Sequence, residues 1–257
     1  MRIISWNVNG IRAIAGKGFI EWIRSDDPDI LCVQETKAHI GQLPAELTDL
    51  EGYYGYFAES ERKGYSGVGL YSKDEPLEVD DSFGAPQFDG EGRVLVARYP
   101  DFVLLNVYFP NGKRSAERLR YKMDFYAEFL DFLGSLLREG DSVILCGDVN
   151  TAHRQIDLAR PDENVNVSGF LPEERAWIDE LVAAGFTDTF RMFDDGEGNY
   201  TFWSYITRAR QRNVGWRLDY VFVSDDLKDR VEDAFILSDV RGSDHCPVGI
   251  EVRGLAE

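Results

Sequence analysis

Side chains that can bind a metal ion or move a proton follow short apolar segments at six places in the chain. The residues concerned are Asn7, Glu35, Tyr108, Asp148, Asn150, Asp219, Asp244 and His245. Carboxylate and carbonyl oxygens suit Mg²⁺ or Mn²⁺ better than zinc. Because the chain has three histidines and no C-x-x-C pair, the pattern favours a hard cation bound mainly by oxygen.

The spacing of these residues predicts which of them meet. In an extended backbone, residues i and i+2 project to the same side, so Asp148 and Asn150 should face one pocket. Asn7 and Asn9 have the same spacing. Strand ends at one edge of a sheet commonly line binding sites. We therefore expect the polar strand ends to converge on one pocket rich in carboxylates and amides.

Each residue also has a purely structural interpretation. An Asp or Asn after a strand is most often a turn former, His245 could be a hydrogen-bonded structural residue, and Glu35 could cap a helix. Asp244 and His245 are neighbours and would point apart in a regular strand, so a loop before Pro247 must bring both into use. The joint occurrence of these residue types at strand ends in one chain favours the functional interpretation.

Hydrophobic periodicity predicts the elements that position these residues. Strands are predicted at Arg2–Val8, Asp29–Gln34, Gly67–Tyr71, Val94–Arg98, Phe102–Tyr108, Ser142–Cys146 and Leu218–Val223. Helices are predicted at Gly18–Ser25, Ser115–Leu137 and Glu173–Ala184, with Ser115 as an N-cap and Pro172 at a helix start. This alternation indicates mixed sheets covered by helices. It does not distinguish one open doubly wound sheet from two packed sheets.

Composition limits the class of protein. The three cysteines, Cys32, Cys146 and Cys246, are far apart and have apolar or Pro neighbours, which indicates buried free thiols. The chain opens without a signal-peptide pattern, and no apolar run approaches the roughly 20 residues that span a bilayer. We therefore expect an intracellular, cytoplasmic protein without a membrane partner.

The net charge of −18 counts against a nucleic-acid partner, but the distribution of charge matters more than its sum. Residues 206–217 contain Arg208, Arg210, Arg212 and Arg217 and no acid. Residues 111–122 contain Lys113, Arg114, Arg118, Arg120 and Lys122 with a single acid. The two segments could form one basic face that contacts backbone phosphates, or they could be ordinary solvated surface.

Six sequence blocks together resemble the motifs of a known enzyme family. They are Ser5–Gly10, Leu31–Lys37, Val107–Gly112, Gly147–Asn150, Asn213–Tyr220 and Gly242–Pro247. In content and order they resemble the exonuclease III family of abasic-site endonucleases, within the DNase I-like endonucleases, exonucleases and phosphatases. The resemblance implies one domain over residues 1–257, folded as a four-layer α/β sandwich of two mixed β-sheets flanked by helices.

The resemblance also implies a DNA repair hydrolase. It would act as a monomer with Mg²⁺, or Mn²⁺, and incise double-stranded DNA 5′ to abasic or damaged nucleotides. It leaves open 3′–5′ exonuclease and deoxyuridine-directed activity. The matching positions imply Asn7, Glu35 and Asp244 as metal-binding residues and Tyr108, Asp148, Asn150, Asp219 and His245 as catalytic residues. Many relatives carry Asp where this chain has Asn9, so Asn9 is not assigned as a ligand.

A mechanism follows from the chemistry of the catalytic residues. Asp148 would orient or deprotonate the attacking water, and Asn150 would fix its position. His245 would donate a hydrogen bond to a phosphate oxygen while Asp219 holds its tautomer. Tyr108 would donate to the same phosphate. Whether Asp148 or His245 is the base stays open at this point.

The residues expected to bind substrate are Arg114, Asn164, Phe202, Trp203, Arg208, Arg210 and Trp216. The aromatic residues could wall a pocket for an extrahelical sugar, although Phe202 and Trp203 fit a structural core equally well. Two rival hypotheses remain. The chain could be another phosphohydrolase of the superfamily that acts on RNA, inositol phosphates or sphingomyelin, or a nucleic-acid-binding protein whose catalysis has lapsed.

Overall fold

The structure is a computed structural model that describes residues 1–206 and 208–255. Within these ranges two six-stranded mixed β-sheets pack face to face. Sheet A contains β1 (Arg2–Asn7), β2 (Ile30–Gln34), β3 (Tyr54–Ala58), β4 (Val68–Ser72), β11 (Val231–Ile236) and β12 (Val248–Val252). Sheet B contains β5 (Glu78–Asp80), β6 (Val94–Arg98), β7 (Val103–Tyr108), β8 (Val143–Asp148), β9 (Phe186–Asp188) and β10 (Asp219–Ser224).

The two sheets share one plan. The strand order is β11-β12-β1-β2-β4-β3 in sheet A and β5-β6-β7-β8-β10-β9 in sheet B. The two central strands of each sheet are parallel, β1 with β2 and β7 with β8, and the other neighbours are antiparallel. Parallel neighbours end at the same edge: Asn7 pairs with Gln34, and Tyr108 pairs with Asp148. Residues that follow these strands therefore gather at one edge of each sheet.

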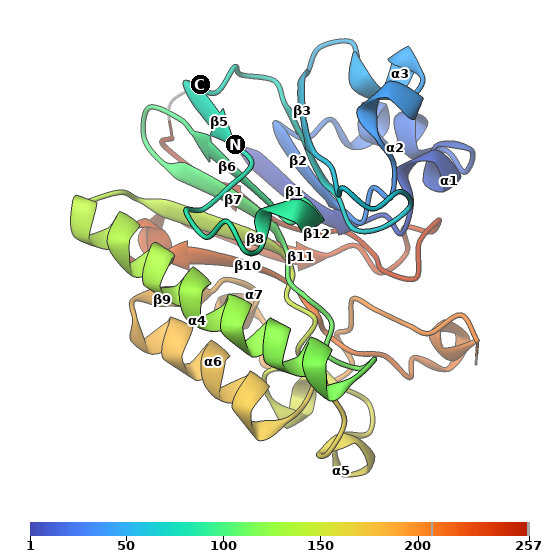
Figure 1. Cartoon of the computed structure of the whole chain (residues 1–257), viewed down its shortest axis with the longest axis vertical. Coiled ribbons are helices and arrows are strands. Elements are labelled where there is room, and N and C mark those ends of the chain that lie inside the picture. The colour runs from blue at the N-terminus through green and yellow to red at the C-terminus, as the bar shows by residue number, and fades with distance from the viewer. Residues whose placement is uncertain (207, 256–257) are drawn as a thin grey trace.

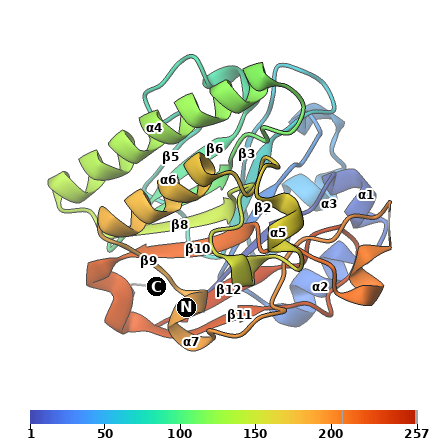
Figure 2. The ribbon, with the colours of Figure 1, turned by 90° about the horizontal axis from the view of Figure 1, so that it is seen from below.

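Helices cover the outer face of each sheet, and the inner faces form the central core. α4 (Ala116–Glu139) and α6 (Pro172–Ala183) pack on sheet B, whereas α1 (Ile11–Ala15), α2 (Phe19–Asp26) and α3 (Ala45–Thr48) pack on sheet A (Figure 1). Seen from below, the layers follow one another as helix, sheet, sheet and helix (Figure 2). The four-layer sandwich is therefore confirmed, and a single open sheet is excluded.

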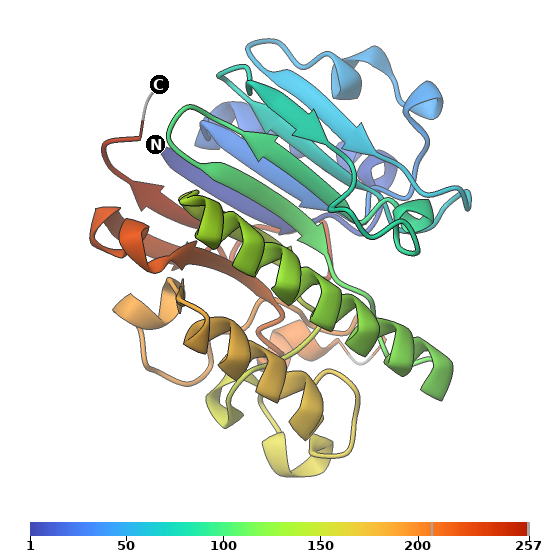
Figure 3. The ribbon, with the colours of Figure 1, turned by 60° about the vertical axis from the view of Figure 1, so that its left-hand side comes forward.

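Local sequence explains where the longer helices begin and end. Ser115 is confirmed as the N-cap of α4, because its Oγ accepts a hydrogen bond of 3.2 Å from the backbone N–H of Arg118. Gly140 ends α4 in a left-handed conformation that costs glycine little. Pro172 begins α6, where a missing backbone donor is tolerated. Figure 3 shows α4 lying across sheet B with α6 beside it.

The seven predicted strands and three predicted helices are confirmed, with small shifts at their ends. Five strands (β3, β5, β9, β11 and β12) and four short helices, α1, α3, α5 (Pro161–Asn164) and α7 (Phe190–Phe193), were not predicted. The start of the chain lies beside the end of β12, because the Met1 ammonium donates to the Val252 carbonyl oxygen at 2.8 Å. The three cysteines are buried and free, as expected. No helix within the described ranges is long and apolar enough to cross a membrane.

Candidate active site

The interior of the sandwich changes from apolar to polar toward one edge. Every second residue of a strand faces the same side, so each central strand contributes a short inward-facing series. From the apolar end these series are Ile3, Ser5 and Asn7 on β1; Ile30, Cys32 and Gln34 on β2; Leu104, Asn106 and Tyr108 on β7; Ile144, Cys146 and Asp148 on β8; and Val223, Val221 and Asp219 on β10. The candidate site is the polar end of this interior.

β1 and β8 leave their sheets through the same turn. The N–H of Asn9 donates to Asn7 Oδ1 at 3.0 Å, and the N–H of Asn150 donates to Asp148 Oδ1 at 2.8 Å. Asn9 and Asn150 have left-handed φ values of 47° and 57°, which asparagine tolerates. The predicted extended geometry is therefore wrong at both places. The turn nevertheless brings each pair together, with Asn150 Nδ2 3.3 Å from Asp148 Oδ2.

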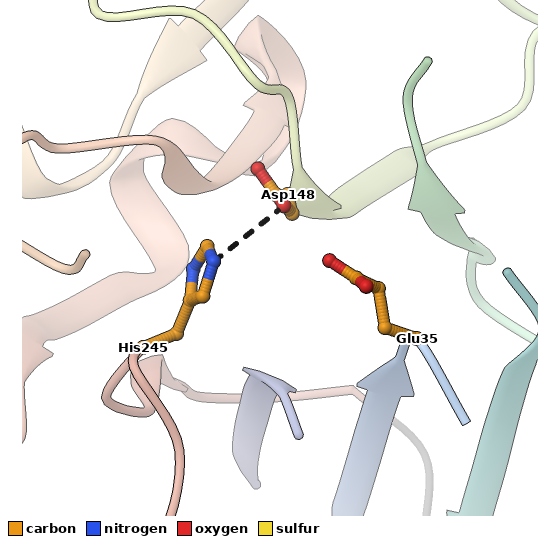
Figure 4. Close-up of side chains that lie close together, drawn as sticks. All are labelled: Glu35, Asp148 and His245. Carbon is orange, nitrogen blue, oxygen red and sulfur yellow. Dashed lines mark ion pairs between the residues drawn. The ribbon is translucent and has the colours of Figure 1, made fainter. Parts of the chain in front are cut away.

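Glu35, Asp148 and His245 form the centre of the site. One potential ligand atom from each residue lies within 4.8 Å of the others, and the three side chains point toward one space (Figure 4). Asn7 Nδ2 joins the two carboxylates by donating to Glu35 Oε1 and Asp148 Oδ2, both at 2.9 Å. Nε2 of His245 lies 3.9 Å from Asp148 Oδ2. We refer to Glu35, Asp148 and His245 as the central cluster.

A loop before β12 presents His245 to the central cluster, as the sequence requires. The N–H of Cys246 donates to the carbonyl oxygen of Thr201 at 2.8 Å, and the N–H of Trp203 donates to that of Asp244 at 2.9 Å. The two segments therefore pair around Asp244 and His245. Ser243 Oγ donates to the Asn7 carbonyl oxygen at 2.8 Å, which ties this loop to the end of β1.

Asp219 fixes the orientation of His245. Burial lowers the pKa of His245, but the carboxylates of Asp219 and Asp148 outweigh it and raise that pKa to about 10. The imidazole is therefore positively charged at neutral pH. Its Nδ1 donates to Asp219 Oδ2 at 2.8 Å, so Nε2 faces Asp148. Thr201 Oγ1 donates to the same Asp219 oxygen at 2.5 Å, and the Phe202 ring packs against the imidazole with ring centroids 4.9 Å apart.

The protonation of Asp148 and Tyr108 is also set by burial. Burial raises the pKa of Asp148 to about 7, and the negative charge of Asp219 acts in the same direction. Burial and the charge of Glu35 hold the pKa of Tyr108 well above its ordinary value, so the phenol keeps its proton. Asp148 can thus change its charge near neutral pH, whereas Tyr108 remains a hydrogen-bond donor.

Lys37 and Asn9 stand between Glu35 and Asp244, the two carboxylates expected to bind metal. Lys37 Nζ lies 2.6 Å from Glu35 Oε2 and donates to Asn9 Oδ1 at 2.5 Å. Asn9 Nδ2 donates to Asp244 Oδ1 at 2.8 Å. Burial raises the pKa of Glu35, but the charge of Lys37, hydrogen bonds from Asn7 and Lys37, and the charge of His245 together lower that pKa below its ordinary value. Glu35 is therefore ionised in a partly buried position.

The donor atoms of the central cluster suit a hard divalent cation. Mg²⁺ binds oxygen at about 2.0–2.1 Å in octahedral geometry, so its ligand atoms lie up to about 4 Å apart. The carboxylate oxygens of Glu35 and Asp148 lie within 4.8 Å of each other and need only a small closure to meet this requirement, whereas the imidazolium of His245 has no free nitrogen for a metal. Glu35 and Asp148 supply the carboxylate oxygens that such a cation prefers.

Arg114 and Arg208 are exposed at the margins of the site. Arg114 lines a cavity of about 620 Å³ that Tyr108 also lines. Arg208 lines a second cavity of about 390 Å³, which Asp244 borders. Both guanidinium groups can therefore reach a large substrate that covers the central cluster.

Phe202 and Trp216 lie in a small apolar cluster next to His245. They pair through an isolated β-bridge, and both are partly buried. The other members of this cluster are Ala152, Leu158, Phe170 and Leu218. Lys113 places its ammonium 4.8 Å from the centroid of the Trp216 ring. The partial exposure of the two rings leaves an apolar surface beside the charged centre.

Trp203, Arg210 and Asn164 make contacts that hold neighbouring loops. Trp203 is buried, and the Arg210 guanidinium lies 4.5 Å from the centroid of its ring. Arg210 Nη2 donates to the carbonyl oxygens of Ser238 and Val240 at 2.8 and 2.6 Å. Asn164, at the end of α5, donates to the Arg160 carbonyl oxygen at 2.7 Å. Trp203 is packed as a core residue would be, which is one of the two interpretations that the sequence allows.

Two residues of the basic segments are buried and cannot contact DNA phosphates. Arg217 pairs with Asp157 at 2.7 Å and with Asp188 at 2.6 Å. Lys122 pairs with Glu174 at 2.7 Å. Lys122 and Arg217 are therefore not part of any basic face that the two segments form. The sequence identifies a basic residue, but only the fold shows which acidic residue pairs with it.

Sequence analysis missed three residues that support the site. Lys37 could have been found, because it follows Glu35 by two positions within a recognised block. Thr201 gave no signal, although its Oγ1 contacts Asp219 and accepts the backbone N–H of that residue at 3.1 Å. Arg93 gave none either; its Nη1 donates to the Tyr108 carbonyl oxygen at 2.9 Å, and its guanidinium lies 4.7 Å from the Tyr108 ring centroid.

A known protein family matches most of this chain. The Endonuclease/Exonuclease/phosphatase family matches residues 4–245. The chain belongs to this family. The match includes the whole central cluster, and the resemblance inferred from the six sequence blocks is thereby confirmed.

Relatives within the family extend over nearly the whole chain. The exodeoxyribonuclease of Bacillus subtilis (strain 168) is 44% identical over 255 residues, which cover 98% of this chain and 100% of that protein. The DNA repair nuclease APEX1 of Danio rerio is 46% identical over 251 residues, which cover 96% of this chain and 81% of that protein. This family member is thus a DNA repair nuclease of the exodeoxyribonuclease and AP endonuclease type, a phosphodiester hydrolase.

Solved structures show the same fold. An AP endonuclease from Archaeoglobus fulgidus superposes with a TM-score of 0.89 at 29% identity and covers 99% of this chain and 100% of that chain. The 3′ phosphatase NExo from Neisseria, bound to a product DNA hairpin, gives a TM-score of 0.90 at 28% identity and covers 99% of this chain and 100% of that chain. The sandwich of this family member is therefore the fold of a solved AP endonuclease and of a solved 3′ phosphatase.

Proposed function

We propose that the central cluster hydrolyses the phosphodiester bond 5′ to an abasic or damaged nucleotide in double-stranded DNA, with Mg²⁺ as the metal and the chain acting as a monomer. The arrangement of Asp148, His245 and Asp219 carries this proposal. A carboxylate with a pKa of about 7 faces an imidazolium that a second buried carboxylate orients. One group can accept a proton from water while the other offers positive charge to a phosphate.

Asp148 is the general base in this proposal. A base works best when its pKa lies near the operating pH, because it is then ionised and still basic enough to take a proton. Asn7 and Asn150 donate to Asp148 Oδ2 and so hold the carboxylate in one orientation. With a pKa of about 10, His245 already carries its proton at neutral pH. This charge state favours Asp148 over His245 as the base.

His245 and Tyr108 donate hydrogen bonds to the phosphate. Asp219 occupies Nδ1 of His245, so the proton on Nε2 is the one available to substrate. The pKa of Tyr108, held high by burial, keeps its hydroxyl proton in place. Because both donors are fixed before substrate binds, each can lower the barrier by about 2.7–4 kcal/mol.

Glu35 would bind Mg²⁺ directly, with Asn7 close by and Asp244 linked to the site through Asn9. Mg²⁺ in proteins usually keeps several waters and takes one or two carboxylates, so the short carboxylate set of this site suffices. When bound, Mg²⁺ supplies positive charge that stabilises the phosphoryl oxygens and the departing 3′ oxygen. Lys37 holds the ionised form of Glu35 that this binding requires.

The surroundings of the central cluster support an abasic sugar as the preferred target. Phe202 and Trp216 offer partly exposed rings beside His245, suited to a deoxyribose turned out of the helix. Arg114 and Arg208 lie on either side and can contact phosphates of the flanking duplex. The combination fits a large, distorted polyanion better than a small phosphate ester.

A substrate panel tests this proposal. The protein would be incubated with a duplex that carries one abasic site, the matching undamaged duplex, an RNA duplex and an inositol polyphosphate, each with Mg²⁺ or with EDTA. We expect Mg²⁺-dependent incision immediately 5′ to the abasic site that leaves a 3′ hydroxyl. Preferential hydrolysis of RNA or the inositol polyphosphate would contradict the proposed substrate, and binding of abasic DNA without incision would contradict the proposed catalysis.

A further inference from the structure

Three buried polar side chains connect the two sheets directly beneath the candidate site. Gln34 Nε2 donates to Ser5 Oγ at 2.9 Å and to Asn106 Oδ1 at 2.8 Å. Asn106 Nδ2 donates to the carbonyl oxygens of Gly69 at 2.8 Å and Val33 at 3.3 Å. Asn106 belongs to sheet B and the other four residues to sheet A, so these bonds cross the sandwich. We refer to them as the Gln34–Asn106 bridge.

The hydrogen bonds determine the orientation of both amides. The amide protons of Asn106 go to two backbone carbonyls, so its Oδ1 must face Gln34. Gln34 must then direct its own NH₂ group toward Asn106 and Ser5. Its Oε1 is buried and has no hydrogen-bond partner within the described ranges. A buried acceptor without a partner is unfavourable, so core stability alone does not account for a glutamine here.

Each end of the bridge is next to a residue of the site. Gln34 directly precedes Glu35, and Asn106 stands two residues before Tyr108 on the same face of β7. Glu35 follows a strand of sheet A and Tyr108 ends a strand of sheet B, yet they are close enough for Glu35 to raise the pKa of the Tyr108 phenol. Their separation therefore depends on how far apart the sheets lie at this edge.

A second hydrogen bond crosses the sandwich far from the site and provides a comparison. Tyr99 Oη donates to Ser72 Oγ at 2.8 Å, and both residues are buried. Ser72 pairs with Ile30 at the start of β2, whereas Gln34 is at its end. This bond joins the same two sheets at the opposite edge, where the interior holds apolar side chains.

We propose that Gln34 and Asn106 are positioning residues that set the distance between Glu35 on sheet A and Tyr108 on sheet B. The inference rests on the proposed roles of Glu35 and Tyr108 in hydrolysis. Apolar packing tolerates small changes in sheet separation, whereas directional hydrogen bonds with fixed donors and acceptors favour one separation. Loss of the bridge should therefore slow the chemical step and weaken Mg²⁺ binding while DNA binding is preserved.

The test compares Asn106→Leu and Gln34→Met with the control Tyr99→Phe. Single-turnover incision of an abasic duplex would be measured across Mg²⁺ concentrations, alongside DNA affinity and Tm. Because a displacement of about 1 Å can cost roughly 100-fold in rate, we expect each bridge variant to lose about 10- to 100-fold and to need more Mg²⁺ for half-maximal rate. Tyr99→Phe should lower Tm yet keep the wild-type rate and Mg²⁺ dependence. The double variant should be no slower than the slower single variant, since both remove one bridge.

Wild-type rate and Mg²⁺ dependence in Asn106→Leu, with only a lower Tm, would overturn the proposal. If Asn106→Leu fails to fold, Gln34→Met decides, because it leaves Asn106 bonded to its two carbonyls. The variant Glu35→Gln distinguishes a failure of the proposed active site from a failure of the bridge proposal. If Glu35→Gln also keeps full Mg²⁺-dependent activity, the proposed site is wrong; if Glu35→Gln is inactive while both bridge variants are normal, only the bridge is wrong.

Discussion

Nδ1 of His245 lies 2.8 Å from Oδ2 of Asp219, and both side chains are buried at the polar end of the sandwich interior. The negative charge of Asp219 keeps His245 protonated to about pH 10. It also adds to the burial that raises the pKa of Asp148 to about 7. One carboxylate thus acts on the charge of both groups that we propose to contact the substrate.

Replacement Asp219→Asn should lower kcat by about 10³- to 10⁴-fold, because an amide can neither orient the imidazolium nor stabilise its charge. The pKa of His245 should fall with the loss of the carboxylate. The alkaline limb of the pH–rate profile should therefore move from near pH 10 toward neutral pH. An unchanged alkaline limb in the variant would show that His245 does not act as a charged donor.

Asp148→Asn should inactivate the enzyme and yet stabilise the metal-free fold at pH 8. The folded-state pKa of Asp148, about 7, lies above its ordinary value of 3.8, so this group costs stability as pH rises from about 4 to 7. In EDTA at pH 8 the variant should gain about 2–4 °C or more in Tm. At pH 4 most of this gain should be lost, because Asp148 is then protonated in the folded state and close to its ordinary pKa in the unfolded state. Calorimetry at the two pH values checks this, and a lower Tm at pH 8 would contradict it.

Arg114→Ala should weaken binding of abasic and undamaged duplex DNA alike, because an exposed arginine contacts phosphates without reading bases. The slope of log affinity against log salt should fall by about 0.9 for one lost phosphate contact. Anisotropy titrations over a range of salt concentrations measure this slope. Arg24→Ala, on the exposed side of α2, is the matched control and should leave the slope unchanged. If the wild type, Arg114→Ala and Arg24→Ala have equal slopes, Arg114 does not contact DNA phosphates.

Lys122→Met should lower the free energy of unfolding by about 3–5 kcal/mol, because it leaves Glu174 buried without its cation. The double variant Lys122→Met/Glu174→Gln should recover part of this loss, since the amide carries no charge. Denaturant unfolding measures both values. At a temperature where Lys122→Met is folded, the salt dependence of its DNA binding should equal that of the wild type. A smaller slope of log DNA affinity against log salt in Lys122→Met would show that Lys122 contacts DNA phosphates.

The sequence identified the strands that carry the site but not all strands of the fold. β2, β7, β8 and β10 are buried along their whole length and β1 in all but its first residue, so these strands have long apolar runs. By contrast, β11 and β3 expose several of their residues, and β5 and β9 have three residues each, so their apolar signal is weak. Edge strands lack the composition on which the prediction depends.

Within the site, residue types were predictable and local geometry was not. Asn150 was expected to follow Asp148 in extended backbone, but a left-handed turn brings it back to the same carboxylate. The buried partners of Arg217 and Lys122 come from distant parts of the chain, and no spacing rule links them. Thr201 could not be predicted for the same reason, because its role depends on a hydrogen bond to Asp219, which lies 18 positions later in the chain. Contacts set by packing between elements require the fold.

In the proposed function, the central cluster performs metal-dependent hydrolysis next to an abasic site. The most direct test of this proposal is single-turnover incision of a duplex with one abasic site, in Mg²⁺ and in EDTA, by the wild type, His245→Ala and His153→Ala. His153 pairs with Asp179 at the surface, so it is a matched control. We expect the wild type and His153→Ala to cut 5′ to the lesion only with Mg²⁺, and His245→Ala to be slower by at least about 100-fold. Equal rates for the two histidine variants, or undiminished incision in EDTA, would contradict the account.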